Sequence, residues 1–288
     1  MMISKSFLLL PLCLVLAGGT SMAQDHHDYG DITKPEFFPI LPWNYYAAKK
    51  MSYRGTTGLA GVEQAHFNFA PFAFPKELEL CRELGLSAIV GPEDGSTLKD
   101  LRGANYSAKE VDRRVRKMID DAGSNPAVKG YFIMDEPGVR DFPLLARAVA
   151  TVKEHAPGKL AYINLCPDYA TIGAPDQSQL GTSSYTEYLE RFVNEVKPQM
   201  LSYDNYMVQI SQDMTNAAKA ASYYRNLLEV RRVALKYDLP YLNIVCANQI
   251  RPYTTIPSPA NLAFQAYTTL AAGYRGQRRV GLKREVRG

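Results

Sequence analysis

The chain has 288 residues, of which 46% are hydrophobic and 22% charged, with 20 glycines and 18 prolines. This composition excludes a collagen, a coiled coil and a generally disordered protein, and the length suits either two small domains or one α/β barrel of roughly 250 residues. The formal net charge is +4, but the last twelve residues carry all of it and Lys5 adds one more, which leaves the rest of the chain at −1. We therefore expect no nucleic-acid partner.

The first 23 residues have the pattern of a secretory signal peptide. Lys5 supplies the positive start, residues 7–17 form an apolar run, and Ser21-Met22-Ala23 is a small-x-small cleavage site. We expect a secreted or periplasmic protein after cleavage near Ala23, and no membrane span, because the apolar run is too short to cross a bilayer. An uncleaved anchor is the alternative interpretation. Residues 24–35 are expected to be an N-terminal tail.

Three cysteines follow the leader, at Cys81, Cys166 and Cys246. They are far apart, odd in number and each set in an apolar pattern, and their spacing matches no zinc signature. We expect three buried thiols that pack as small hydrophobic groups. The sequence indicates no metal site and no cofactor.

From about residue 36, apolar strand-like runs alternate with helical patterns. Seven strands are expected, over residues 37–43, 65–69, 86–90, 128–134, 159–165, 200–204 and 241–246. Helices are expected over residues 76–84, 108–122, 141–155, 184–196, 216–236 and 259–271. This rhythm predicts a parallel sheet covered by helices. Because no glycine-rich phosphate loop follows the first strand, we favour a (β/α)8 TIM barrel over an open, doubly wound sheet, with residues 36–276 as the barrel domain.

The end of the chain does not suit a complete barrel. An eighth strand near Tyr274 should be apolar, but residues 274–288 are rich in arginine and lysine. Such a segment cannot be buried on both faces. We interpret residues 277–288 as a basic tail that replaces the end of the eighth strand through truncation or a frameshift. A genuine basic extension after a short strand is the alternative.

The strongest chemical signal is the sequence Asp135-Glu136-Pro137, which directly follows an apolar strand. Pro137 ends the strand, and catalytic groups of parallel barrels lie at the C-terminal ends of strands. A carboxyl group that is partly buried beside another has a raised pKa and can act as a general acid near neutral pH. The structural alternative is that Asp135 caps a turn and Glu136 pairs with an arginine.

This tripeptide resembles the Asn/Asp-Glu-Pro motif at the end of strand four in (β/α)8-barrel glycoside hydrolases of the large retaining β-glycosidase clan. Residues 128–136 are also the fourth strand expected here. Phe38-Pro39-Ile40 is similar to the start of strand one in these enzymes, and Gly273-Tyr274-Arg275-Gly276 to the lead-in to strand eight. The resemblance implies a secreted hydrolase of a poly- or oligosaccharide, with Glu136 as the general acid/base.

The sequence departs from this clan at the nucleophile, which is a glutamate at the end of strand seven in the family. Residues 241–249 contain no acid. Asp204, at the end of the sixth expected strand, is the best candidate for the opposing carboxylate, and Glu93 and Asp94 are weaker ones. A separation of about 5–5.5 Å between the two carboxyl groups would indicate a retaining enzyme, and roughly 6.5–9.5 Å an inverting one.

A second resemblance suggests a different mechanism. Tyr203-Asp204 is similar to the sixth-strand Tyr-Asp of chitinase-type barrels, and Asp135-Glu136 to the adjacent Asp-Glu of β-hexosaminidases. In those enzymes the acetamido group of the substrate is the nucleophile, which would explain the missing glutamate. The chitinase signature itself is absent, because Met134 stands two residues before Glu136.

A sugar site also needs stacking faces and neutral hydrogen-bonding groups near the strand ends. The candidate substrate-binding residues are Trp43, Asn44, His66, Asn68, Glu93, Asn164, Tyr203, Tyr206 and Asn248. Ordinary packing is the alternative for each of them, and for His66 a structural role is the simpler interpretation. Three hypotheses remain open: a glycoside hydrolase with two protein carboxylates, a substrate-assisted hexosaminidase-like enzyme, and a carbohydrate-binding barrel without catalysis. Nothing in the sequence indicates an oligomeric state.

Overall fold

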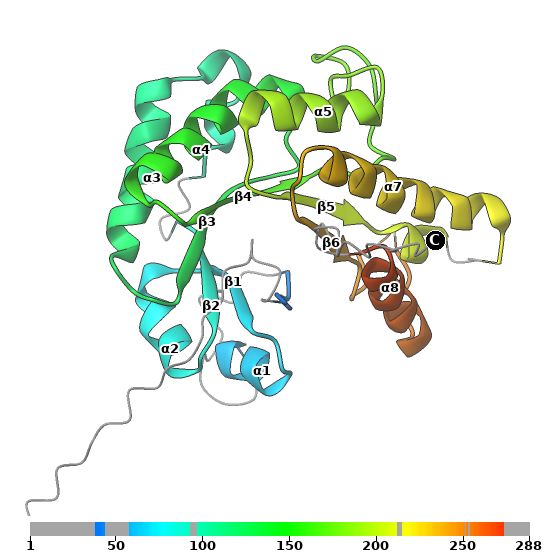
Figure 1. Ribbon diagram of the computed structural model, residues 1–288, viewed down its shortest axis with the longest axis horizontal. Coiled ribbons are helices and arrows are strands. Elements are labelled where there is room, and N and C mark those ends of the chain that lie inside the picture. The colour runs from blue at the N-terminus through cyan, green and yellow to red at the C-terminus, as the bar shows by residue number, and fades with distance from the viewer. Residues whose placement is uncertain are drawn as a thin grey trace, which may run out of the picture.

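The protein is an α/β structure built on one curled sheet of six parallel strands (Figure 1). The computed structural model describes residues 38–43, 58–92, 97–211, 215–250, 252 and 254–273. Neighbours in the sheet follow the chain, in the order β1-β2-β3-β4-β5-β6, and each pair is parallel. The strands are β1 (Phe69–Ala73), β2 (Ser87–Val90), β3 (Val128–Asp135), β4 (Leu160–Leu165), β5 (Leu201–Asn205) and β6 (Tyr241–Val245).

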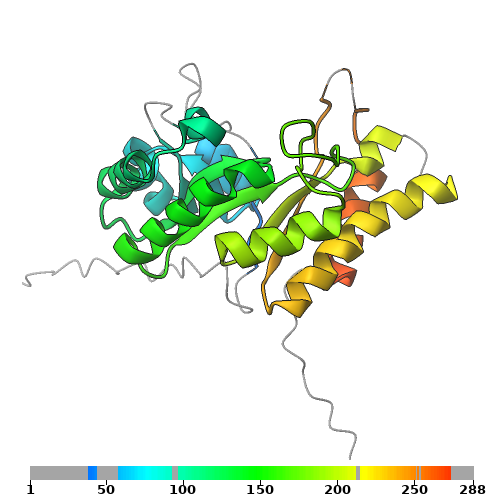
Figure 2. The ribbon, with the colours of Figure 1, turned by 90° about the horizontal axis from the view of Figure 1, so that it is seen from above.

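Helices connect successive strands and cover the outer face of the curl. The α-helices are α1 (Gly58–Gln64), α2 (Leu78–Glu83), α3 (Ala108–Ala122), α4 (Phe142–His155), α5 (Tyr185–Val196), α6 (Met207–Ser211), α7 (Ala217–Lys236) and α8 (Pro259–Ala271). Short 3-10 helices are η1 (Pro75–Glu77), η2 (Lys99–Leu101), η3 (Gly103–Asn105) and η4 (Val139–Asp141). Figure 2 shows α3, α4, α5 and α7 side by side along this face. The strands and helices thus form an incomplete, barrel-like curl.

Polar caps define the ends of the long helices. The Ser107 hydroxyl accepts a hydrogen bond from the Glu110 amide at the start of α3, and Ser184 does the same for Glu187 in α5. Gly123, with φ of 59°, ends α3 in a backbone conformation that glycine adopts without strain. These are local signals, which is why the expected helix over residues 108–122 matches α3 at both ends.

Two expectations about the first strands were wrong. Residues 38–43 are described but form no strand. The Asn68 amide donates to the Ile40 carbonyl, but the Ile40 amide donates to the Asn68 side chain, so no regular backbone ladder forms. The strand expected over residues 65–69 begins only at Phe69, since α1 and a turn at His66 precede it. As a result, the strand that carries Asp135 is the third described strand, not the fourth.

Several expectations fall outside the described residues. They are the leader 1–23, the tail 24–35, the eighth strand near Tyr274 and the basic tail 277–288. Of the helices in the described part of the chain, none has the length and apolar character needed to cross a membrane.

The sheet separates two hydrophobic clusters. The larger one joins the strands to the helices and includes Val115, Phe142, Phe192 and Val230, all almost fully buried. The smaller one lies on the inner face and consists of strand residues together with Met200, with Trp43 and Tyr206 packed against it. Phe72, Phe132 and Tyr162 form its aromatic centre, with the Trp43 ring centroid 4.8 Å from that of Phe72. The inner face is therefore filled with apolar side chains below the C-terminal edge of the sheet.

Candidate active site

A bulge in β3 sets which side chains reach the inner face. Phe132 pairs with Tyr162 in β4, but Met134 pairs with Ile163, so that one extra residue enters β3 between them. Strict alternation after Phe132 would place Met134 on the inner face. The bulge instead buries Met134 in the helix-side core and brings Asp135 level with Asn164. The side chain at position 134 therefore faces the helix-side core and does not contribute to the inner face.

Asn164 connects two carboxylates from different strands. Its amide nitrogen donates to Asp135 Oδ1 at 3.1 Å and to Asp204 Oδ1 at 2.9 Å. Its amide oxygen accepts from the Ser202 hydroxyl at 2.8 Å, and Ser202 in turn is 2.8 Å from the hydroxyl of Tyr162. Asn164, Ser202 and Asp204 are all buried. Their hydrogen bonds fix a polar layer directly above the apolar cluster of the inner face.

Glu136 is held in an unusual backbone conformation next to this layer. Its φ is +46°, which is uncommon for a residue other than glycine and is found preferentially at functional sites. The Glu136 amide donates to the Asn164 carbonyl at 2.8 Å, which continues the pairing of β3 with β4. The Glu136 and Asp204 carboxyl groups lie close enough for each to affect the pKa of the other.

The surroundings raise the pKa of all three carboxyl groups. Burial raises the pKa of Asp135, against the hydrogen bond from Asn164, which lowers it. Burial also raises the pKa of Glu136, although its side chain reaches solvent at the cleft, and the neighbouring Asp135 charge raises it further. The pKa of Asp204 lies well above its usual range, mainly because the group is buried. A set of coupled acids with raised pKa values is suited to proton transfer near neutral pH.

A cleft of about 610 Å³ opens beside Glu136 at the C-terminal edge of the sheet. Its walls come from the segments that follow β2, β3 and β4. The lining residues are Arg102, Gly103, Glu136, Gly138, Arg140, Asp141, Cys166, Thr171, Gln177, Ser178 and Gln179. The cleft therefore combines one candidate acid, two arginines and several neutral hydrogen-bonding groups.

Five of the residues expected in the site lie on the inner face. Asp135, Asp204 and Asn164 form the polar layer, with Tyr206 and Trp43 beside it. Burial and the neighbouring Asp204 charge raise the pKa of the Tyr206 hydroxyl, and the Tyr206 backbone amide donates to the hydroxyl of Tyr169 at 3.2 Å. Trp43 is half-buried in the aromatic cluster, where it packs edge-on against Phe72. These side chains come from four separate segments of the chain.

Three expected residues lie elsewhere. His66 and Asn68 precede β1 and so lie at the N-terminal edge of the sheet, opposite the carboxylates. The Asn68 side chain ties residues 38–40 to this edge, with Nδ2 donating to the Phe38 carbonyl at 2.8 Å. Tyr203 is buried in the helix-side core, because neighbouring residues of a strand point to opposite faces and Asp204 takes the inner one.

Asn248 follows β6 at the C-terminal edge, where it is exposed and its carbonyl accepts from the Cys246 thiol at 3.0 Å. Nothing described connects it to the carboxylates. Asn44, Glu93 and Asp94 lie outside the described residues. The expectation of buried, unpaired cysteines is confirmed for Cys81, Cys166 and Cys246. Within the described ranges, no group of three or more potential metal ligands comes together.

Sequence reasoning missed the two arginines of the cleft. Arg102 follows η2, and Arg140 lies in η4 only four residues after Glu136. Neither belongs to a recognisable motif, and arginine is common on protein surfaces. The closeness of Arg140 to the Asp-Glu-Pro segment was the one signal that pointed to it.

No protein-family profile matches the sequence, and no curated protein does. Similar solved structures include a candidate alpha-L-fucosidase from Bacteroides thetaiotaomicron, with 13% identity, a TM-score of 0.47, and coverage of 78% of this chain and 67% of that one. A beta-D-glucuronidase of Dictyoglomus thermophilum has 11% identity and a TM-score of 0.45, over 73% of this chain and 36% of that one. A Bacteroides uniformis beta-glucuronidase has 13% identity and a TM-score of 0.45, over 73% of this chain and 25% of that one.

The likeness thus covers only a quarter to two thirds of the length of those proteins. Scores of this size describe a partial similarity in the path of the chain. The chemistry of this protein is therefore derived from its own side chains.

Proposed function

We propose that this protein is a glycoside hydrolase in which Glu136 is the general acid/base. One observation carries the proposal. Two strand ends bring Asp135, Glu136 and Asp204 together around Asn164, with raised pKa values, beside an open cleft. In its protonated form, Glu136 would give its proton to the oxygen of the leaving sugar as the glycosidic bond breaks. The same carboxylate would then take a proton from water and return to its starting state.

The role of Asp204 separates two versions of this mechanism. In the first, Asp204 acts across the sugar ring from Glu136, as nucleophile or as base. That geometry requires about 5–5.5 Å or roughly 6.5–9.5 Å between the two carboxyl groups. The shorter separation would make the reaction retaining, and the longer one inverting.

The second version is substrate-assisted. A 2-acetamido group of the sugar would attack the anomeric carbon, while Asp135 and Asp204 orient that group. No protein nucleophile is then needed, which agrees with a β6 end that carries no acid. Water would afterwards open the cyclic intermediate, with Glu136 as the base.

The test is the hydrolysis of aryl glycosides with and without a 2-acetamido group, by wild type, Glu136→Gln and the control Glu154→Gln on the exposed face of α4. All three proteins must first melt cooperatively. We expect Glu136→Gln to lower kcat/KM by about 100-fold or more for poor leaving groups, and much less for activated ones that need no proton. Glu154→Gln should match wild type.

Turnover restricted to 2-acetamido sugars would support the substrate-assisted version. Turnover of sugars that lack this group would support the version with two protein carboxylates. Equal activity of wild type and Glu136→Gln on poor leaving groups would refute the role of Glu136. A folded wild type that binds sugars without cleaving any of them would support the third hypothesis, a carbohydrate-binding barrel.

A further inference from the structure

The cleft beside Glu136 contains two arginines that the proposed reaction does not use. We infer that Arg140 and Arg102 form a subsite for the carboxylate of an acidic sugar, so that the preferred substrate carries a uronic acid. This inference rests on the proposed glycosidase function and adds the substrate class to it. The cleft is large enough for a sugar ring, at about 610 Å³.

Arg140 supplies a charge that no described group neutralises. The residue is exposed, lines the cleft, and makes no ion pair with a carboxylate in the described part of the chain. Arg140 lies in η4, four residues after Glu136 in the chain. A guanidinium group recognises planar carboxylates well, because two parallel N–H groups match the two carboxylate oxygens.

Arg102 is held in place by its own contacts. Its Nη2 donates to the Asp135 carbonyl at 3.3 Å, and its Nε lies 3.6 Å from Asp141 Oδ2. Asp141 is itself fixed, since its carboxylate accepts from the Gly138 amide at 3.0 Å. These contacts use one edge of the guanidinium group. The Nη1 donors have no described partner, and 37% of the side chain is exposed, so that donors remain for a ligand.

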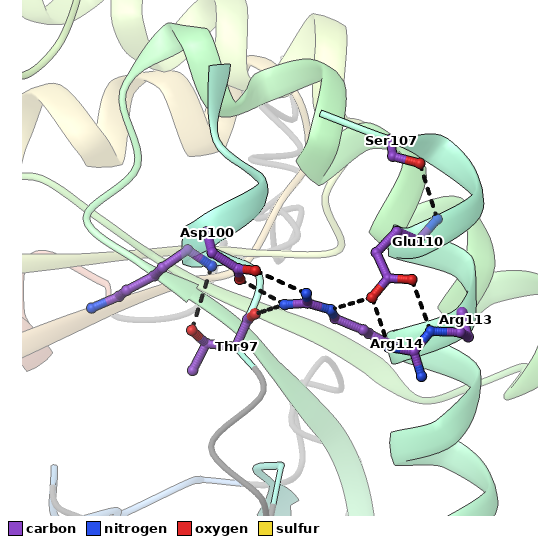
Figure 3. Close-up of polar contacts among 7 residues, drawn as sticks. Thr97, Asp100, Ser107, Glu110, Arg113 and Arg114 are labelled. Atoms are coloured by element: carbon purple, nitrogen blue, oxygen red, sulfur yellow. Dashed lines mark hydrogen bonds and ion pairs between the residues drawn. The ribbon is translucent and has the colours of Figure 1, made fainter. Parts of the chain in front are cut away.

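A second arginine network fixes the segment that presents Arg102 (Figure 3). Arg114, on α3, donates to both carboxylate oxygens of Asp100, at 2.6 and 2.8 Å, and to the Thr97 carbonyl at 2.6 Å. It also donates to Glu110 at 2.8 Å. These bonds anchor residues 97–101 to α3 immediately before Arg102. The position of Arg102 is therefore set by the scaffold, and a preorganised donor loses less entropy on binding.

A further part of the lining offers neutral groups for sugar hydroxyls. Thr171, Gln177, Ser178 and Gln179 line it, in the segment between β4 and α5. The Val139 amide donates to the Leu180 carbonyl at 3.0 Å, and a Cβ at Gly138 would collide with the Gln179 carbonyl. This wall is thus packed directly against η4, which carries Arg140. A ligand in the cleft would meet the two guanidinium groups as well as amides and hydroxyls.

The charge balance of the cleft favours an anion in the state that acid catalysis needs. The carboxylates in the lining are Asp141, which pairs with Arg102, and Glu136. Burial raises the pKa of Glu136 and so favours its neutral form. When Glu136 holds its proton, Arg140 is left as an uncompensated positive charge. An acidic sugar would neutralise this charge, whereas a neutral sugar would leave it unpaired.

The experiment has a binding arm and a kinetic arm. Calorimetry on Glu136→Gln, alone and combined with Arg140→Gln or the control Arg116→Gln on the exposed face of α3, measures binding of D-glucuronate, D-galacturonate, D-glucose, D-galactose and inorganic sulfate. We expect a uronate to bind at least tenfold more tightly than its neutral counterpart, and Arg140→Gln to remove this difference. In the kinetic arm, Arg140→Gln should raise KM for aryl uronides about tenfold with little change in kcat.

The outcomes separate this inference from the proposed function. Uronate binding that depends on Arg140, without turnover of any glycoside, would keep the subsite and refute the glycosidase. Turnover with no preference for acidic sugars, and no effect of Arg140→Gln, would refute the subsite and keep the glycosidase. Sulfate binding as tight as uronate binding would refute recognition of an acidic sugar. An effect of Arg116→Gln equal to that of Arg140→Gln would reduce the result to long-range charge and also refute the subsite.

Discussion

Asp135 and Glu136 are consecutive in the chain, yet both take part in the same polar cluster. A regular strand would direct them to opposite faces. The positive φ at Glu136 interrupts this alternation, whereas the bulge before Met134 decides that Asp135 faces inward. A left-handed conformation at a residue other than glycine is costly and persists only where the surrounding structure enforces it. The Asp135 charge adds to the effect of burial and raises the pKa of Glu136, because it disfavours the ionised form of its neighbour.

This coupling gives a prediction for the pH dependence of activity. The Asp135 charge contributes to the raised pKa of Glu136. Asp135→Asn removes that charge but keeps an oxygen that accepts from Asn164, so the pKa of Glu136 should fall. A general acid is active only while protonated, so the alkaline limb of the kcat/KM profile should move to lower pH. Profiles of wild type and Asp135→Asn measure this shift, and Asp121→Asn on exposed α3 serves as control. A limb that stays in place would show that Glu136 is not the titrating acid.

Asp204 gives a prediction for stability. Its pKa is higher in the folded protein than in the unfolded chain, mainly because of burial. The folded state therefore binds more protons, and the contribution of Asp204 to stability is fully present below the unfolded pKa and is lost as the pH rises through the folded pKa. Asp204→Asn removes this loss, since an amide of the same shape carries no charge.

We expect Asp204→Asn to melt roughly 2–4 °C higher than wild type at pH 8, which corresponds to about 1 kcal/mol for a domain of this size. At pH 3.5 the advantage should be absent. Thermal melts of both proteins at the two pH values check this. Equal melting temperatures at pH 8 would show that the ionised Asp204 carboxylate does not destabilise the folded state. A higher melting temperature of Asp204→Asn would mean that the carboxylate is kept for function at a cost in stability.

At the scale of elements, the sequence predicts regular structure well and local distortion poorly. The charged helix α3 has a serine cap, an apolar stripe and a terminal glycine, and its predicted bounds match. The bulge in β3 leaves no such trace, because Ile133 and Met134 fit a buried strand equally well in either register. For this reason Asp135 and Glu136 could be singled out from the sequence, but their arrangement around Asn164 could not. The position of Tyr203, in contrast, could have been predicted from the sequence. With Asp204 on the inner face, simple alternation assigns Tyr203 to the helix side.

Residues 38–43 show why a hydrophobic pattern is not enough to define a strand. The pattern is apolar, and the inner face does take up Leu41 and Trp43. A strand also requires regular backbone pairing. Here one backbone bond joins the Asn68 amide to the Ile40 carbonyl, but the Ile40 amide and the Phe38 carbonyl bond to the Asn68 side chain. Side-chain hydrogen bonds of this kind compete with backbone pairing. They are decided by the tertiary arrangement and cannot be read from local composition.

The connection between η2 and α3 gives the prediction at this scale. Arg114 is mostly buried, with 16% exposed, and bonds to Asp100, Glu110 and the Thr97 carbonyl. Arg114→Leu should destabilise the protein by about 1–3 kcal/mol, since it leaves these acceptors without their donor. Arg113 is 60% exposed and shares Glu110. Arg113→Leu should therefore cost less than about 1 kcal/mol.

Urea unfolding of the two variants gives this comparison, and hydrogen exchange of the amides of residues 99–102 locates the effect. We expect faster exchange there for Arg114→Leu alone. A similar loss of stability in both variants, without faster exchange at residues 99–102, would contradict this. That result would mean that the loss of a positive charge, and not the loss of the Arg114 contacts, lowers the stability.

At the scale of the whole molecule, one sheet separates two cores that share the same strands. Unfolding of the helix-side core would remove the surface on which the inner cluster packs. The two should therefore unfold together, in a single cooperative transition. The sequence contains one tryptophan, Trp43, which lies in the inner cluster within ring-contact distance of Phe72, Phe132 and Tyr162. Its fluorescence reports on the inner face, while circular dichroism reports mainly on the helices of the outer face.

In wild type, the two signals should change at the same urea concentration. Asn68→Ala should separate them, because it removes the hydrogen bonds from the Ile40 amide to Asn68 Oδ1 and from Asn68 Nδ2 to the Phe38 carbonyl, at 2.7 and 2.8 Å. It keeps the backbone bond from the Asn68 amide to the Ile40 carbonyl and removes no bond between strands. The fluorescence transition would then move to a lower urea concentration, which corresponds to a loss of about 1–2 kcal/mol of local stability. The circular dichroism curve should stay nearly unchanged. Asn194→Ala, which removes exposed bonds to Glu190 and Tyr237, should leave the two curves together. If the curves already differ in wild type, the inner cluster is an independent unit, and the polar layer above it gains no rigidity from the helix-side core.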